Sequence, residues 1–163
     1  MAKATFYPIG NADCTLIRLN DDRTLLIDFC NENCDDGRVK PDAALQDALR
    51  DQRRDYFDVV VFTHGDDDHV HGVEDFFYFE CEKKYQGEDR IKIRELWVPT
   101  CLILDETLGK SALLVQQEAR HRLLAGRGIR VFGEPKTLEA WLASSGYDIA
   151  TSTPCCASRN LLA

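Results

Sequence analysis

Apolar and polar positions alternate in short runs over the first thirty residues of the chain. The runs that predict β-strands are residues 6–9, 14–19 and 24–29. Polar turns separate these runs, at residues 10–13 and 20–22. Strands that follow one another so closely can pair only in antiparallel fashion. The chain is therefore predicted to open with a three-stranded antiparallel meander.

After residue 40 the pattern changes to an alternation of helices and strands. Pro41 begins the first predicted helix, because proline is favoured in the first helical turn, and Leu45 and Leu49 belong to its apolar stripe. The elements predicted after it are a strand at 59–62, a helix at 73–79, a strand at 95–98, a helix at 108–123 ended by Gly126, and a strand at 129–132. This rhythm, added to the meander, predicts an α/β (α+β) fold.

Composition narrows the class of protein. The chain has 163 residues, of which 44% are apolar and 29% charged, values typical of one globular domain. We assign residues 1–143 to this domain and residues 144–163, which are small and polar without a period, to a poorly ordered tail. No segment approaches the ~20 apolar residues of a membrane helix, and the N-terminus lacks a signal-peptide core. A cytoplasmic protein without membrane association is expected.

Charge and cysteine content argue against two further classes of protein, stable nucleic-acid binders and disulfide-stabilised proteins. The net charge of −8 disfavours stable binding to nucleic acid, although a small-molecule or nucleic-acid-derived substrate stays compatible with it. Seven cysteines at irregular spacing, without a secretory signal, argue against a disulfide framework. Cys30 and Cys34 lack the second pair that a structural zinc site needs, so neutral thiols are the preferred interpretation.

The segment 63–72 holds three of the four histidines and three consecutive carboxylates, directly after a predicted buried strand. Imidazole nitrogen and carboxylate oxygen together suit zinc, manganese or iron. If the chain leaves the strand extended, His64, Asp66 and Asp68 project to one side, and His69 joins them after a turn. A calcium-binding EF-hand loop is excluded, because the residues at three of its required positions do not fit. An acidic surface turn with incidental histidines is the remaining alternative.

Two separated motifs resemble one known family. Residues 63–69 read Thr-His-Gly-Asp-Asp-Asp-His, similar to the T-H-x-[HD]-x-D-H motif of the metallo-β-lactamase superfamily. The form with aspartate at the fourth position resembles the hydrolase domain of the bacterial competence protein ComEC and its free-standing relatives. Residues 10–14, Gly-Asn-Ala-Asp-Cys, followed by Leu-Leu-Ile-Asp at 25–28, are similar to the opening of the same family.

The resemblance implies the N-terminal half of an αββα sandwich with two divalent metal ions at one edge of its sheets. Zinc is the expected metal, with manganese or iron as alternatives. His64 and Asp66 would bind the first ion, and Asp68 and His69 the second. Asp68 would also orient or deprotonate the attacking water. Asp28 and Asp13 would support these ligands without binding metal. For Asp28 the alternative is a carboxylate that caps a turn at the end of a strand.

The chain departs from the family in its second half. The family supplies further ligands downstream, a third histidine, a bridging aspartate and often a last histidine. After His71, which is either a surface residue or a polar group at the mouth of the site, this chain has only His121, inside a predicted helix. Asp148 is the only late aspartate, and the chain is about half to two-thirds as long as the family's catalytic unit. A truncated, half-built site is therefore expected.

Three functional hypotheses follow. The first is a metal-dependent hydrolase that acts on phosphodiester or related phosphoryl or acyl ester bonds through a metal-activated water. The second is a catalytically inactive fragment. The third is a module whose site is completed by an oligomer or by a partner chain.

Overall fold

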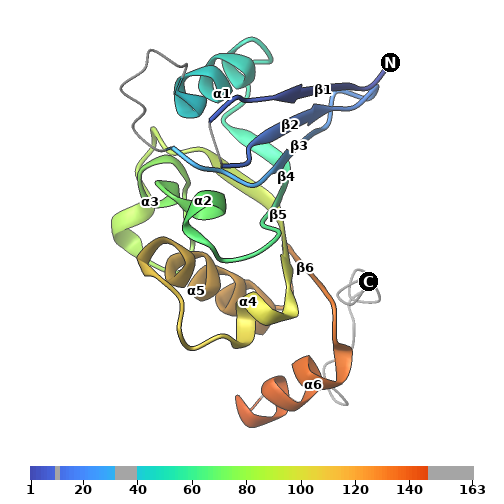
Figure 1. Cartoon of the computed structure of the whole chain (residues 1–163), viewed down its shortest axis with the longest axis vertical. Coiled ribbons are helices and arrows are strands. Elements are labelled where there is room, and N and C mark those ends of the chain that lie inside the picture. Colours follow the sequence, from blue (N-terminus) through green and yellow to red (C-terminus); the bar gives the residue numbers. More distant parts are fainter. Residues whose placement is uncertain (10–11, 32–39, 147–163) are drawn as a thin grey trace.

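The computed structural model describes residues 1–9, 12–31 and 40–146 and is built on one six-stranded sheet (Figure 1). Its strands lie side by side in chain order: β1 (Lys3–Phe6), β2 (Thr15–Arg18), β3 (Thr24–Ile27), β4 (Tyr56–Val61), β5 (Lys92–Pro99) and β6 (Ile129–Phe132). Strands β1 to β3 pair antiparallel, as the meander required, and β3 to β6 pair parallel. The sheet is therefore mixed.

Helices lie between consecutive parallel strands, except the last one, which follows β6. They are α1 (Pro41–Arg50), α2 (Asp67–Val70), α3 (Val73–Phe76), the 3-10 turn η1 (Lys83–Tyr85), α4 (Thr100–Leu104), α5 (Lys110–Ala125) and α6 (Pro135–Ser144). Pro41 occupies the first turn of α1, and Gly126 ends α5 in the left-handed conformation with φ 66°. The α/β (α+β) class is confirmed. None of the described helices is long and apolar enough to cross a membrane.

Several predicted boundaries were wrong. The first strand ends at Phe6, and residues 7–9 lie outside any strand except for an isolated bridge between Ile9 and Ala12. The helix predicted at 73–79 is the single turn α3, because the chain becomes extended at Phe77 to bury its ring. Helices α4 and α6 were not predicted. Helix α6 ends at Ser144, and residues 147–163 of the predicted tail lie outside the described part of the chain.

The buried face of the sheet carries the core. Leu26, Val60 and Leu96 face one another across β3, β4 and β5, and each is fully buried. The register continues this row to buried residues of β2 and β6. Figure 1 shows α2 to α5 on one side of the strands. Burial of this row against the helices is the main stabilising contribution, about 1.5–3 kcal/mol for each large side chain.

A cluster of phenylalanines joins the core to the segment after β4. Phe29 stacks on Phe76 with 4.6 Å between ring centroids and meets the edge of Phe77 at 5.3 Å. Phe77 in turn contacts Phe62 at 6.3 Å. These rings come from the end of β3, the end of β4 and the end of α3. Their contacts hold both ends of the segment between β4 and α3 against the core.

The opposite face of the sheet is apolar and only partly covered. One cross-strand row on it consists of Phe6, Ile27, Val61 and Trp97, together with Thr15 on β2, and it ends at Arg130 on β6. Phe6 is 76% exposed, and the others are half-buried. Parallel strands are usually covered on both faces. This face is therefore unusual for the parallel half of the sheet.

Candidate metal centre

The histidine-rich loop leaves β4 at the carboxyl edge of the parallel strands, where loops from neighbouring strands meet. The chain stays extended through Asp66 and then turns into α2, so Asp68 and His69 lie in a helical turn. The N–H of His69 donates to the carbonyl of Asp66 at 2.9 Å and closes that turn. The prediction that Asp68 lies on an extended segment was therefore wrong. Asp68 lies in the helical turn of α2, and that turn buries Val70 in the core.

Asp28 is the centre of the hydrogen-bond network behind this loop. It follows β3 in the left-handed conformation, with φ 53°, and only 2% of its surface is exposed. Its carboxylate accepts three hydrogen bonds, from the N–H of Thr63 at 2.8 Å, the Thr63 hydroxyl at 2.6 Å and Nδ1 of His69 at 2.9 Å. An ionised carboxylate only accepts, so Nδ1 of His69 carries the proton and Nε2 has a free lone pair.

Thr63 extends this control to the second histidine. The Thr63 hydroxyl donates its only proton to Asp28, and its oxygen lies 2.9 Å from Nδ1 of His64. That oxygen can therefore only accept from Nδ1, which leaves Nε2 of His64 with a free lone pair as well. One buried carboxylate thus sets the tautomer of both imidazoles. Sequence reasoning missed this role of Thr63, although the residue stands next to His64.

Ligand atoms from three of the four predicted metal-binding residues converge. Atoms of His64, Asp68 and His69 lie within 4.8 Å of one another, and the two imidazole centroids are 3.6 Å apart. Nε2 of His69 lies 3.6 Å from Asp68 Oδ2. Two ligands of one zinc ion, each about 2.0–2.2 Å from it, are about 3.3–3.6 Å apart at the tetrahedral angle. The pair of His69 and Asp68 therefore has the spacing of two ligands of one divalent cation, with a ligand atom of His64 close by.

The other two predicted carboxylates stand at the rim of this cluster. Asp66 is 77% exposed, outside the three-residue cluster, but its Oδ2 lies 3.5 Å from Nε2 of His64. Asp13 was expected to support the ligands without binding metal. Its Oδ2 lies 4.0 Å from Nε2 of His69. Asp28 is the residue that lies behind the ligands.

A small cleft of about 260 Å³ adjoins the cluster. Its lining includes Asp66 on one side and Asp105, Leu108 and Ala112 on the other. Gly65 forms part of the floor, and a Cβ there would meet Leu108 Cδ2 at 2.8 Å. Glycine at this position therefore allows close packing against Leu108, in the segment before α5.

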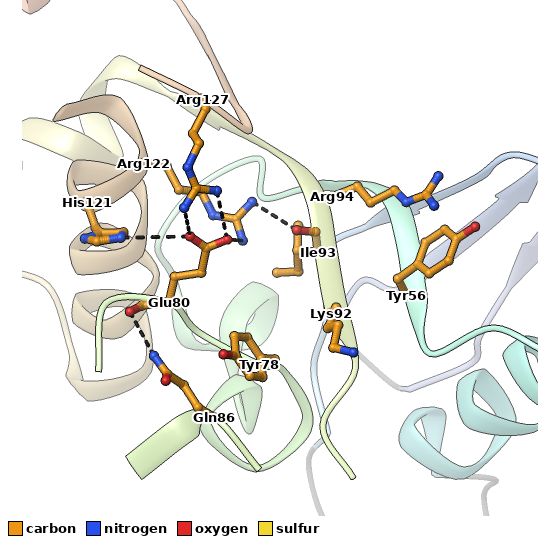
Figure 2. Close-up of a pocket in the computed structure, with 10 residues that line it drawn as sticks. All are labelled: Tyr56, Tyr78, Glu80, Gln86, Lys92, Ile93, Arg94, His121, Arg122 and Arg127. Carbon is orange, nitrogen blue, oxygen red and sulfur yellow. Dashed lines mark hydrogen bonds and ion pairs between the residues drawn. The ribbon is translucent and has the colours of Figure 1, made fainter. Parts of the chain in front are cut away.

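The two remaining histidines stand apart from the cluster. His71 lies on the surface, with Nδ1 3.2 Å from Asp67 Oδ2. His121 lines a pocket of about 650 Å³ at the opposite edge of the sheet, where β4 begins at Tyr56 and β5 at Lys92 (Figure 2). Asp148 and Cys34 lie outside the described residues. Within the described ranges, the sequence therefore supplies no downstream histidine to the cluster.

Several side chains that line the pocket with His121 form an ion-pair network around Glu80 (Figure 2). Arg127 approaches Glu80 at 2.6 Å, and Arg122 and His121 at 3.9 and 4.0 Å. Partial burial by itself raises the pKa of Glu80, but the hydrogen bond from Arg127 and the nearby positive charges outweigh it and hold that pKa below its usual value. The network ties the end of α5 to the segment after α3.

Among the described residues, the cluster of His64, Asp68 and His69 includes no cysteine. Cys14 is a core residue with 2% of its surface exposed. Burial, with repulsion from Asp28 and Cys30, raises the pKa of the Cys14 thiol to about 12. A thiol binds metal as the thiolate, so Cys14 stays a neutral core residue near pH 7.

Comparison of this chain with protein-family models, with curated proteins and with solved structures found no match. Since fold alone does not determine activity, the function has to be argued from the chemistry of the site.

Proposed function

We propose that this chain is a metal-dependent hydrolase with the N-terminal half of a metallo-β-lactamase sandwich, acting on phosphodiester or related ester bonds. One observation carries the proposal. Nδ1 of His69 is hydrogen-bonded to the buried Asp28, Nδ1 of His64 is hydrogen-bonded to Thr63, and ligand atoms of both imidazoles converge with the carboxylate of Asp68. An acidic surface turn needs no buried carboxylate to set the tautomers of its histidines.

His64, Asp68 and His69 would hold the ion, zinc first and manganese or iron as alternatives. Three side chains with one open position are the usual set for a catalytic zinc. The dinuclear arrangement implied by the family resemblance pairs His64 with Asp66 on one ion and Asp68 with His69 on the other. The distances of 3.5 and 3.6 Å within these pairs are compatible with it. Metal stoichiometry distinguishes one ion from two.

The residues of the chain prepare the site for hydrolysis. Asp68 is about half exposed, so one of its oxygens can accept a proton from the attacking water. Asp66, Asp67 and Asp68 together repel a phosphate anion, so substrate binding depends on a bound cation. When bound, such a cation supplies Lewis-acid chemistry that activates water and stabilises charge on a phosphoryl or carbonyl oxygen.

The test combines metal content with activity. Purified protein should contain zinc, manganese or iron, and should hydrolyse bis-(p-nitrophenyl) phosphate when Zn²⁺ or Mn²⁺ is added. His64→Ala and Asp68→Ala should lose both metal and activity. His121→Ala is the matched control, because it removes a histidine from the opposite edge of the sheet and should change neither. Folded protein that binds no divalent metal would overturn the proposal.

A second candidate is a module completed by another copy of the chain. The partly covered apolar sheet face favours it, as does the position of His121, which among the described residues is remote from the cluster. Specific activity should then rise with protein concentration as dimers form, and light scattering should give twice the chain mass. A monomer with full activity would contradict it. Stoichiometric metal without turnover of phosphodiesters, thioesters or a β-lactam would instead indicate an inactive fragment.

A further inference from the structure

The turn before β2 brings a carboxylate from a distant part of the sequence to the front of the cluster. Asp13 Oδ2 lies 4.0 Å from Nε2 of His69. Because Nδ1 of His69 is bound to Asp28, Nε2 is the nitrogen available to a cation. Asp13 and Asp28 therefore stand on opposite sides of the same imidazole, Asp28 on the buried side and Asp13 on the open side.

The backbone around Asp13 is fixed to the metal loop. The N–H of Asp13 donates to the carbonyl of Asp68 at 3.4 Å. The residues on either side, Ala12 and Cys14, are buried at 8% and 2% exposure, while the Asp13 side chain is 74% exposed. This alternation, with both neighbours anchored in the core, directs the carboxylate outward beside His69.

We propose that Asp13 is a direct ligand of the ion held by Asp68 and His69. This inference rests on the proposed function, since it needs a cation at that position. A shift of about half an ångström would bring the 4.0 Å separation into the range of two ligands on one zinc ion, about 3.3–3.6 Å. An exposed side chain makes such a shift without repacking the core.

The consequence is an oxygen-rich environment for this ion. His69 supplies one nitrogen, and Asp68 and Asp13 supply carboxylate oxygens. Such a set accepts Mn²⁺ as well as Zn²⁺, because carboxylates suit manganese and imidazole suits zinc. It also gives the N-terminal turn a binding role in place of the supporting role that the sequence suggested.

The experiment compares two single-charge variants. Asp13→Asn and Asp67→Asn each remove one negative charge from the same region. Asp67, however, is 80% exposed and paired with His71, so it serves as the electrostatic control. Zn²⁺ and Mn²⁺ affinities would be measured by competition with a chromophoric chelator. The visible spectrum of the Co²⁺-loaded protein would report the ligand set.

Asp13→Asn should weaken metal binding at least tenfold and alter the Co²⁺ spectrum, while Asp67→Asn should stay within about threefold of the wild type. Equal effects of the two variants would overturn the inference about Asp13, provided that His69→Ala abolishes binding. Wild-type protein that binds none of the three metals would instead overturn the proposed function itself. Because Asp13 is exposed, loss of folding should not obscure the result, and circular dichroism checks this directly.

Discussion

Thr63→Val tests the claim that one buried carboxylate orients both histidines. The substitution keeps the shape of the side chain and removes only the hydroxyl. That hydroxyl donates to Asp28 at 2.6 Å and accepts from Nδ1 of His64 at 2.9 Å. His69 keeps its own bond to Asp28, so the two imidazoles become distinguishable.

The size of the expected effect follows from the hydrogen bonds that Asp28 and His64 lose in the Thr63→Val variant. A hydrogen bond to a charged acceptor contributes about 1.5–3 kcal/mol, and the lower end applies because Asp28 keeps its two other donors. We therefore expect about 1.5–2 kcal/mol less stability for the apo protein. Removing the outer partner of a ligating histidine weakens metal binding about 10–100-fold. The lower end again applies, since His64 is 42% exposed and water can replace the hydroxyl.

Three measurements check this prediction. Urea unfolding in the presence of a chelator gives the change in stability. Competition with a chromophoric chelator gives the Zn²⁺ affinity, where a tenfold loss corresponds to about 1.4 kcal/mol. Long-range ¹H–¹⁵N NMR of the imidazoles identifies which nitrogen carries the proton. His64 should populate both tautomers in the variant, whereas His69 should keep its proton on Nδ1.

Thr107→Val is the matched control. Its hydroxyl also donates to a carboxylate at 2.6 Å, that of Asp105, but on an exposed loop across the adjoining cleft, and no hydrogen bond joins this pair to the histidines. It should change stability by less than about 0.5 kcal/mol and leave metal affinity unchanged. If Thr63→Val binds Zn²⁺ as tightly as the wild type and His64 stays protonated on Nδ1, the reasoning about the network is wrong.

Three further predictions concern the framework around the site. Gly72→Ala should cost about 1–2 kcal/mol in urea unfolding, because φ is +80° and a Cβ would lie 3.0 Å from that of Asn31; an unchanged midpoint would refute the strain. Arg122→Met should cost about 3–5 kcal/mol in the same assay, since it leaves the fully buried Glu118 without its partner at 2.7 Å, and a neutral result would contradict this. The raised pKa of Cys14 keeps its stabilising effect fully present below pH 9 and removes it as the pH rises toward 12, so Cys14→Ala should flatten the alkaline loss of Tm; parallel curves for variant and wild type would contradict this.

Local signals in the sequence were sufficient for most elements of the fold. The proline at the start of α1 and the glycine after α5 determine the ends of these helices through the conformation of one backbone turn. The apolar run before the histidine-rich loop predicts a buried strand by itself. Helix α4 was missed, because five residues are too few to show a helical period, and its buried residues follow β5 without a polar break. Helix α6 was missed although Pro135, Leu138 and Leu142 mark its first turn and buried side.

The sequence alone determined which ligand types are present and that they follow a buried strand, because residue identity and short-range patterning are written along the chain. Only the tertiary structure decided how they are arranged. Asp28 accepts a hydrogen bond from Thr63, 35 positions away, and Asp13, in the segment before β2, lies 4.0 Å from His69. Which nitrogen of each imidazole is left free to bind a ligand depends on hydrogen bonds between these separate segments. Such contacts form only when the sheet brings β3 and β4 side by side.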